Sequence, residues 1–284
     1  MSSRKKPATA LPITPQRMDF DFAGVPRHWF DNDPVLTHFL NALSLTFPDG
    51  ERFFVDSVRA FRDHVTDPER KQEIAGFIGQ EAMHSLEHES FNKMLAAQGY
   101  AEQAQGGQKL ARYLIGEGRK RLSPKRQLAA TAALEHITAI LANRLLKDAE
   151  LLQSMAPEVR ALWMWHAIEE IEHKAVAFDL YQDVTGADYL LRVRVLLAAT
   201  LALASYTSKY TWAFLKQDRL HRNPLVLARG AWRLFGARGL LTRTVPDFLQ
   251  FLRPGFHPWQ DDNSALVAYW RAELERLEPA QNAA

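Results

Sequence analysis

Proline is almost absent from the middle of this chain, and this constrains the fold more than any other feature of the sequence. Between Glu69 and Asn223 there are only two prolines, Pro124 and Pro157. Each can begin a helix, because proline fits the first helical position, and a serine before Pro124 supplies a good N-cap. Apolar residues recur three and four positions apart, clearly so over residues 74–94, and strand-like alternation is nearly missing. The sequence therefore predicts an all-α fold.

The helical spacing predicts an elongated antiparallel bundle. A helix of 28 to 30 residues is about 42–45 Å long, and several such helices joined by short turns are typical of bundles. The stretch Gly99–Gly107 is expected to be the clearest internal loop. Longer helices are expected at 34–46, 50–64, 68–97, 124–152, 157–184 and 188–216, and shorter ones at 108–121, 225–235, 239–252 and 263–277.

Three segments are expected along the chain. Residues 1–18 start with basic residues and are then broken by three prolines, which predicts a flexible tail and not the apolar core of a signal peptide. Residues 19–185 are expected to form the bundle, and residues 186–284 a C-terminal helical extension packed on it. The longest uncharged apolar run, Val195–Thr207, has 13 residues and is too short to span a bilayer by itself.

Composition narrows the chemistry. The chain has no cysteine and ten histidines, so disulfides, thiolate zinc sites, iron–sulfur clusters and cysteine nucleophiles are excluded. Any metal ion must be held by nitrogen and oxygen. The net charge is only +2, which argues against a dedicated nucleic-acid-binding protein.

Two Glu-x-x-His motifs stand in otherwise apolar helical stretches. Glu81 and His84 form the first, in the helix expected at 68–97, and Glu170 and His173 form the second, in the helix expected at 157–184. Residues three positions apart lie on one face of a helix. The carboxylate and imidazole of each pair can therefore bind the same metal ion.

Two other helices each offer one glutamate, Glu51 and Glu135. Together with the two motifs they match the ligand formula of ferritin-like bundles with two iron or manganese ions. The alternative is a bundle whose buried polar groups only satisfy one another, but four buried glutamates without cations would be costly. We therefore expect a ferritin-like antiparallel bundle with a dinuclear metal centre. A helix starting at residue 50 would leave Glu51 in its first turn.

His166 lies four residues before Glu170 and shares a narrow stripe with Glu170 and His173, because each residue turns the helix by about 100°. A metal ion level with Glu170 would be within about one turn of both imidazoles. His166 is therefore a candidate third histidine ligand. The alternative is a core histidine that is hydrogen-bonded beside Trp163 and Trp165.

Other polar residues near the motifs are candidates for supporting roles. His88, one turn beyond His84, could support the ligands or line a pocket. Glu169 and Glu172 could pair with basic residues or hold the free N–H of a ligand histidine. Asp179 is a further candidate carboxylate behind the ligands. His136 points about 100° away from Glu135, and we interpret it as structural.

These motifs resemble those of a ferritin-like family described as predicted metal-dependent hydrolases. The resemblance runs from about Met18 onward. The stretches that carry it are Phe47-Pro-Asp-Gly-Glu-Arg-Phe-Phe54, Gln80-Glu-Ala-Met-His-Ser-Leu-Glu-His88, Ala133-Leu-Glu-His136, Trp165-His-Ala-Ile-Glu-Glu-Ile-Glu-His-Lys-Ala-Val-Ala-Phe-Asp179 and Arg253-Pro-Gly-Phe-His-Pro-Trp259.

The stretch from His166 to His173 is also similar to the fourth helix of di-iron arylamine N-oxygenases, which use three histidines and four glutamates. What this similarity implies is a ligand set of Glu51, Glu81, His84, Glu135, His166, Glu170 and His173.

Three functions remain open. The first is O₂-dependent oxidation of a small or lipid-like organic substrate, because a nitrogen- and oxygen-ligated iron pair suits O₂ activation. The second is hydrolysis by a metal-activated water, which the resembling family's description implies. The third is a non-catalytic metal-binding protein. The expected cofactors are two divalent transition-metal ions, iron first and manganese as the alternative.

Residues 190–245 are strongly basic, with ten Lys or Arg residues against one acid, Asp218. Aromatic and apolar residues lie between them, a pattern that indicates peripheral contact with an anionic membrane. The alternative, which we favour, is a core helix with a solvated basic face.

The sequence as a whole predicts a cytoplasmic protein with a small-molecule substrate and no nucleic-acid partner. Contact with a membrane surface and assembly as a homodimer are left open.

Overall fold

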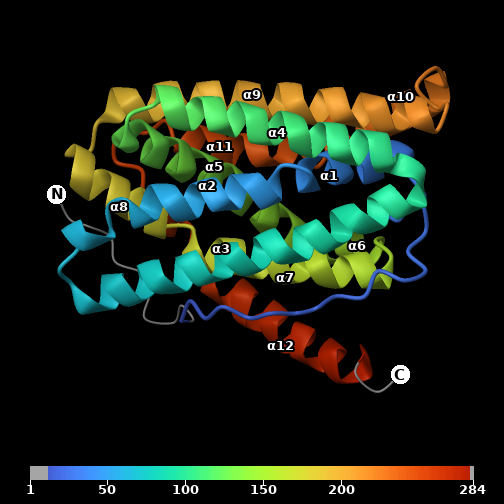
Figure 1. The fold of residues 1–284 in the computed structure, drawn as a ribbon. Helices are drawn as coiled ribbons and strands as arrows, with labels where there is room; N and C mark the ends of the chain where they lie inside the picture. Colours follow the sequence, from blue (N-terminus) through green and yellow to red (C-terminus); the bar gives the residue numbers. More distant parts are fainter. Residues whose placement is uncertain (1–11, 282–284) are drawn as a thin grey trace.

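The computed structural model describes residues 12–281 of the chain (Figure 1). The structure is 76% helical and the described part contains no strand, only one isolated bridge between Phe30 and Met155. The all-α expectation is confirmed.

The main helices follow the predicted pattern, with three shorter 3₁₀ segments and one π-helical turn between them. They are α1 (Pro34–Ser44), α2 (Phe47–Arg59), η1 (Arg62–His64), α3 (Pro68–Leu95), η2 (Ala96–Tyr100), α4 (Ala101–Arg121), α5 (Pro124–Leu146), α6 (Ala149–Gln153), α7 (Pro157–His173), α8 (Val176–Thr185), α9 (Tyr189–Gln217), α10 (Pro224–Phe235), η3 (Thr242–Thr244), α11 (Val245–Gln250), η4 (Pro258–Gln260) and α12 (Ser264–Gln281).

Four helices, α2, α3, α5 and α7, contact one another and form the centre of the bundle. Helix α9 lies over α1 and α5, and α12 lies against α7 on the opposite side of the molecule (Figure 1). The residues after 185 therefore cover two sides of the central helices.

Two buried apolar clusters fill the interior. One contains Phe47, Trp163 and Trp165, and the other contains Phe77 and Phe178. Helices that contribute to both clusters also carry buried charged residues, such as Glu51 on α2 and Glu135 on α5.

Four of the expected helices have different bounds in the structure. Helix α2 begins at Phe47, with Pro48 in its first turn, so Glu51 lies in the second turn and not the first. The helix expected at 157–184 is two helices, because α7 ends at His173 and α8 begins at Val176. The helix expected at 124–152 ends at Leu146 and is followed by the short α6, and the one expected at 239–252 is divided into η3 and α11.

The prediction of a loop at Gly99–Gly107 is wrong, because α4 begins at Ala101. Only Gly99 has a left-handed backbone there, with φ of 95°, and it makes the kink between α3 and α4. Gly107 does not form a turn but allows close contact between α4 and its neighbours. A Cβ atom at Gly107 would lie 2.5 Å from Leu45 Cδ1 and 2.9 Å from the Tyr206 hydroxyl.

The described part of the expected N-terminal tail runs along α3 as an extended segment (Figure 1). It approaches α3 so closely that a Cβ atom at Gly79 would lie 2.2 Å from Pro15 Cγ. The Glu87 carboxylate then accepts hydrogen bonds from the backbone N–H groups of Met18, Asp19 and Phe20. Residues 1–11 of the expected tail lie outside the described residues.

Among the described helices, α9 alone is long and apolar enough to cross a membrane, by length and composition only. Only 22% of its most apolar window is buried, although the helix packs on α1 and α5. An apolar helix that is so exposed leaves an apolar surface on this side of the protein.

Candidate metal centre

The central helices bring all seven candidate ligands into one buried cluster. Helix α2 carries Glu51, α3 carries the first Glu-x-x-His pair, α5 carries Glu135, and α7 carries the second pair with His166. Each of these side chains belongs to a residue that is at most 3% exposed. Their ligand atoms form three groups within 4.8 Å of one another, Glu51–His84–His166, Glu81–Glu135–His173 and Glu81–His84–Glu170.

Glu170 contacts both of the candidate ligand histidines of α7. Its Oε1 lies 2.8 Å from His166 Nε2, and its Oε2 lies 3.7 Å from His173 Nε2. His173 Nε2 also lies 3.3 Å from Glu81 and 3.4 Å from Glu135. Glu170 therefore lies between two groups of ligands, as a carboxylate that bridges two metal ions would.

The orphaned polar atoms of this cluster fit metal ions. Both oxygens of Glu51, Glu81 and Glu135 are buried and have no hydrogen-bond donor among the described residues. His84 Nδ1 and His173 Nε2 also lack a partner. Buried carboxylates without partners are costly, and divalent cations would satisfy their oxygens and the ring nitrogens together.

The electrostatics of the cluster point the same way. Burial, together with the neighbouring carboxylates, raises the pKa of Glu51, Glu81 and Glu135 well above the usual value. Burial would also raise the pKa of Glu170, but its contacts with the two α7 histidines outweigh this and lower it. Burial and nearby imidazoles lower the pKa of His84. Metal ions bind neutral imidazoles and ionised carboxylates, and a cation between these buried, crowded carboxyl groups would favour their ionised form.

Each ligand histidine has its other ring nitrogen held by a partner outside the cluster. His84 Nε2 lies 3.0 Å from Glu169, and His166 Nδ1 lies 2.7 Å from His88 Nε2. Burial and the Glu172 carboxylate raise the pKa of Glu169 to about 9. Partners of this kind fix the tautomer and orientation of a ligand histidine.

His173 is held by a longer chain of contacts. Its Nδ1 lies 3.1 Å from Gln80 Oε1, and Gln80 Nε2 donates to Glu172 at 2.9 Å. Glu172 in turn accepts from Arg271 of α12 at 2.6 Å. The sequence indicated that Glu172 could pair with a basic residue or support a ligand histidine, but it did not indicate the residues that connect Glu172 to His173. Gln80, directly before Glu81, carries no charge and gives no such signal in the sequence.

Asp179 does not lie behind the ligands as expected. Its half-buried carboxylate hydrogen-bonds with His257 Nε2 at 2.9 Å. His136 lies in an apolar setting, with its ring stacked on Phe251 at 4.7 Å, and burial lowers its pKa to about 4. These contacts agree with the structural interpretation of His136.

An apolar cavity of about 250 Å³ reaches the cluster from beside α9, and Glu51 and Glu170 form part of its wall. A smaller cavity of about 50 Å³ touches His166 and Glu170 from the side of α1. Glu51, His166 and Glu170 are thus accessible to a small molecule through these two mainly apolar cavities.

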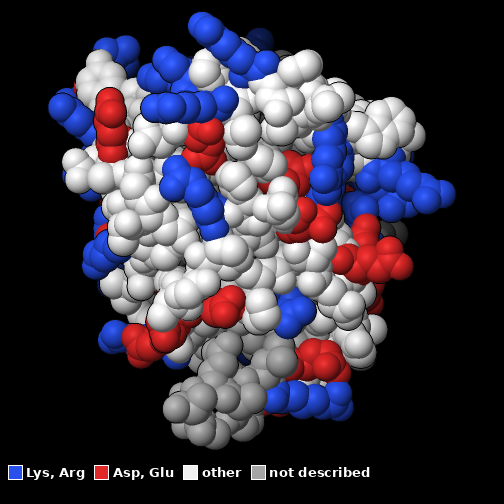
Figure 2. Space-filling view, turned by 90° about the vertical axis from the view of Figure 1, so that its right-hand side faces the viewer, with Lys and Arg blue, Asp and Glu red and all other residues white. Residues whose placement is uncertain are grey.

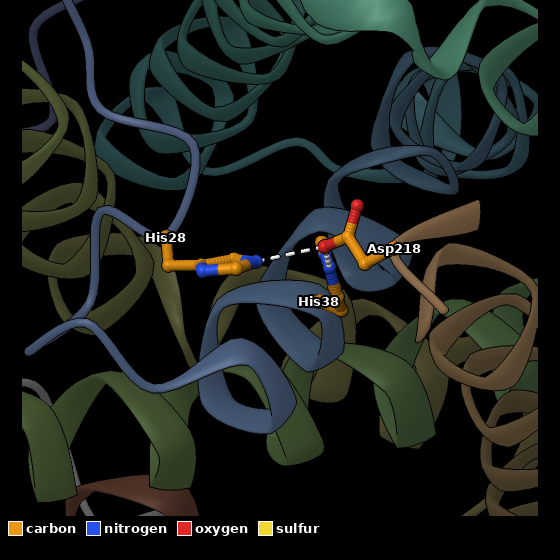
Figure 3. Close-up of side chains that lie close together, drawn as sticks. All are labelled: His28, His38 and Asp218. Carbon is orange, nitrogen blue, oxygen red and sulfur yellow. Dashed lines mark hydrogen bonds and ion pairs between the residues drawn. The ribbon is translucent and has the colours of Figure 1, made fainter. Parts of the chain in front are cut away.

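A second cluster of metal-ligand type was missed by the sequence analysis. His28 and His38 point toward the carboxylate of Asp218, the C-cap of α9, and both Nε2 atoms lie 2.7 Å from its Oδ2 (Figure 3). The same carboxylate accepts hydrogen bonds from Arg27 and from the Tyr100 hydroxyl. The Arg27 guanidinium already pairs with the only carboxylate of this cluster. We therefore interpret the cluster as a set of polar contacts that joins chain segments, and we call it the Asp218 clasp.

The fold and the buried cluster together define an all-helical protein with a candidate metal centre of carboxylates and imidazoles. The family model described as "Predicted metal-dependent hydrolase" matches residues 14–262. The chain belongs to this family, as its motifs indicated. No curated protein and no solved structure matches it.

Proposed function

We propose that the chain is an enzyme that binds two divalent transition-metal ions between α2, α3, α5 and α7. The observation that carries this proposal is the set of buried ligand atoms without partners, contributed by all four helices. One ion would be held by Glu51, His84 and His166, and the other by Glu81, Glu135 and His173. Glu170 would bridge them. The donor set of oxygen and imidazole nitrogen favours iron, with manganese as the alternative.

Hydrolysis is the first candidate reaction, because the family description supports it. A bound metal pair would supply a water whose pKa is lowered toward about 7. The protein's own contribution is orientation. Gln80, Glu169 and His88 hold the ring nitrogens that face away from the cluster, so the three imidazoles are fixed before the substrate binds.

O₂-dependent oxidation is the second candidate reaction, and the types of ligand and the adjacent cavity support it. Three imidazoles and four carboxylates suit iron, and the cavity beside them is lined mainly by apolar side chains. A cavity of this kind excludes water and so protects reactive species from side reactions. The same ligands thus support two reactions, which an experiment has to separate.

Metal analysis tests the shared part of the proposal. Protein purified with added iron and manganese should hold about two ions per chain. Glu81→Ala and His173→Ala should lower that number, and His166→Ala should remove one ion in preference to the other. Asp179→Asn is the control, since this carboxylate pairs with His257. Less than one ion per chain, unchanged by these substitutions, would contradict the proposal.

The reaction is separated by comparing two assays on the same metal-loaded protein. For a hydrolase, p-nitrophenyl octanoate should be cleaved without oxygen, and Glu81→Ala should abolish cleavage. For an oxidase or oxygenase, the reduced, iron-loaded protein should consume O₂ without cleaving the ester. Ester cleavage that survives the loss of metal would contradict the hydrolase candidate.

A further inference from the structure

An apolar groove opens between α9, α10 and the segment formed by η3 and α11. Its floor is made by α1 and α5, and its volume is about 610 Å³, in the range of pockets that bind small molecules. No charged side chain lines it. Trp212, Phe235 and Val245 line the groove and are themselves exposed. The groove therefore offers an uncharged and mainly apolar surface to a ligand that arrives from outside.

The groove adjoins the cavity that touches the candidate metal centre. It shares Leu43 and Leu203 with the 250 Å³ cavity that touches Glu51 and Glu170. A hydrocarbon chain that passes the side chains of Leu43 and Leu203 would reach from the groove, beneath α9, to the carboxylates. Because this path passes under a helix, it suits a flexible chain better than a rigid ring system.

One tyrosine that lines the cavity has a hydroxyl without a partner. Tyr206 of α9 lines the same cavity as Glu51, is 5% exposed, and its buried hydroxyl has no hydrogen-bond partner among the described residues. Buried hydroxyl groups are usually hydrogen-bonded. An oxygen atom of a ligand in the cavity would supply the missing acceptor.

We propose that the groove binds the hydrocarbon tail of a long-chain aliphatic substrate, such as a fatty-acyl compound, whose oxygen-bearing end lies in the cavity. Tyr206 donates a hydrogen bond to that end, and Glu51 and Glu170 face it. This inference rests on the proposed function, because it names the substrate class of the same metal centre. Tyr206 is a positioning residue in this arrangement.

Chain length is the first test. Labelled fatty acids of 6, 10 and 16 carbons are bound to the metal-loaded protein, and the dissociation constants are compared. Affinity should rise by about fourfold per added methylene until the groove is filled, because each buried methylene contributes a similar amount. Equal affinity for the three acids would overturn the proposal.

Filling the groove is the second test. Ala231 of α10 and Ala204 of α9 line the groove. Ala231→Trp and Ala204→Trp should each weaken binding of hexadecanoic acid at least tenfold and leave hexanoic acid unaffected. Ala228→Trp and Ala198→Trp are matched controls, because these exposed alanines lie on the same helices outside the lining. If the groove variants behave like the controls, the proposal fails.

Tyr206→Phe tests the polar end. It should weaken all three acids by a similar factor of about ten and leave the gain per methylene unchanged, whereas a structural defect would lower that gain. An unchanged affinity would remove Tyr206 from the proposal. Metal content is measured on each preparation. Chain-length-dependent binding without metal would contradict the proposed function alone, and metal binding without chain-length dependence would contradict this inference alone.

Discussion

The two ring nitrogens of His173 have different partners at the candidate metal centre. Its Nε2 faces Glu81 and Glu135, while its Nδ1 is held by Gln80. Only the tautomer with the proton on Nδ1 leaves Nε2 free to bind a metal ion. The hydrogen bond to Gln80 therefore determines whether the ring can act as a ligand.

This arrangement makes Gln80 a residue whose loss we expect to weaken metal binding. Gln80→Leu should raise the dissociation constant of the metal by about ten- to a hundredfold, the usual effect of removing such a partner. Competition with a chelator of known affinity measures this change. Gln72→Leu on the exposed face of α3 is the control. An affinity for metal as high as that of the parent protein would contradict the role of Gln80.

The grouping of the candidate ligands on α3 and on α7 could be predicted from the sequence, because spacing on one helix determines which side chains share a face. Gln80 and Arg271 could not, since one carries no charge and the other lies on a distant helix. The expectation for Asp179 failed for a local reason. It assumed a single helix over 157–184, but α7 ends at His173 and α8 begins at Val176, and the Asp179 carboxylate pairs with His257.

At the scale of helices, glycine explains the main error. A cluster of glycines at 99–107 is typical of a loop, yet only Gly99 uses a left-handed backbone. Gly107 is helical, and its missing side chain lets α4 approach Leu45 and Tyr206 closely. Sequence alone does not separate a glycine that makes a turn from one that makes room for a neighbouring helix.

Two glycines of α4 should therefore respond to alanine in opposite directions. Gly107→Ala should destabilise the fold by about 1–3 kcal/mol, because the new methyl group meets Leu45 and the Tyr206 hydroxyl. Gly116→Ala should stabilise it by about 0.5–1 kcal/mol, because nothing lies within 4 Å of a Cβ atom there and alanine favours helix. Urea unfolding measures both. Equal shifts would contradict the close approach of α4.

The Asp218 clasp joins three elements that are distant in sequence. It connects the segment before α1, α1 itself and the end of α9 through one carboxylate. Burial alone would raise the pKa of Asp218, but hydrogen bonds from His28, His38 and Arg27 lower it far below the usual value. Burial also lowers the pKa of His38.

Asp218→Asn should destabilise the fold by about 2 kcal/mol at pH 7, because several donors lose a charged acceptor. The depressed pKa means that Asp218 stabilises the fold fully above the unfolded-state pKa of about 3.9. This contribution is lost as the pH falls through the lower folded-state value. The difference between the two proteins should therefore shrink below pH 4 in urea unfolding. Asp63→Asn, at an exposed carboxylate, is the control. A difference that grows at low pH would contradict the assignment.

At the scale of the whole molecule, exposed apolar residues gather on one side. Ten of the fourteen large apolar side chains that are exposed among the described residues lie between Tyr189 and Leu249. Eight of the ten basic residues of 190–245 are exposed on the same segment. Figure 2 shows Lys and Arg gathered along the upper edge of one end of the molecule, the edge along which α9 and α10 run in Figure 1. The groove opens on this side too.

An apolar surface with a basic rim complements an anionic bilayer, so we expect this side to bind one. Each Lys or Arg near an anionic surface contributes about 1 kcal/mol, and the exposed Trp and Leu side chains add burial in the interface. Vesicles of phosphatidylcholine with phosphatidylglycerol should co-sediment with the protein at low salt, and vesicles of phosphatidylcholine alone should not.

The salt dependence and one matched pair of substitutions locate that contact. Binding should weaken in 0.5 M salt, since about this concentration screens charges beyond a few ångströms. Trp232→Glu, at a residue of α10 that is 70% exposed, should lower binding about fivefold. Tyr269→Glu on α12, which lies on the opposite side and is also exposed, should have no effect. If both substitutions act equally, or if neutral vesicles bind as well as anionic ones, α9 and α10 do not form a membrane-binding surface, and a substrate would have to reach the groove from solution.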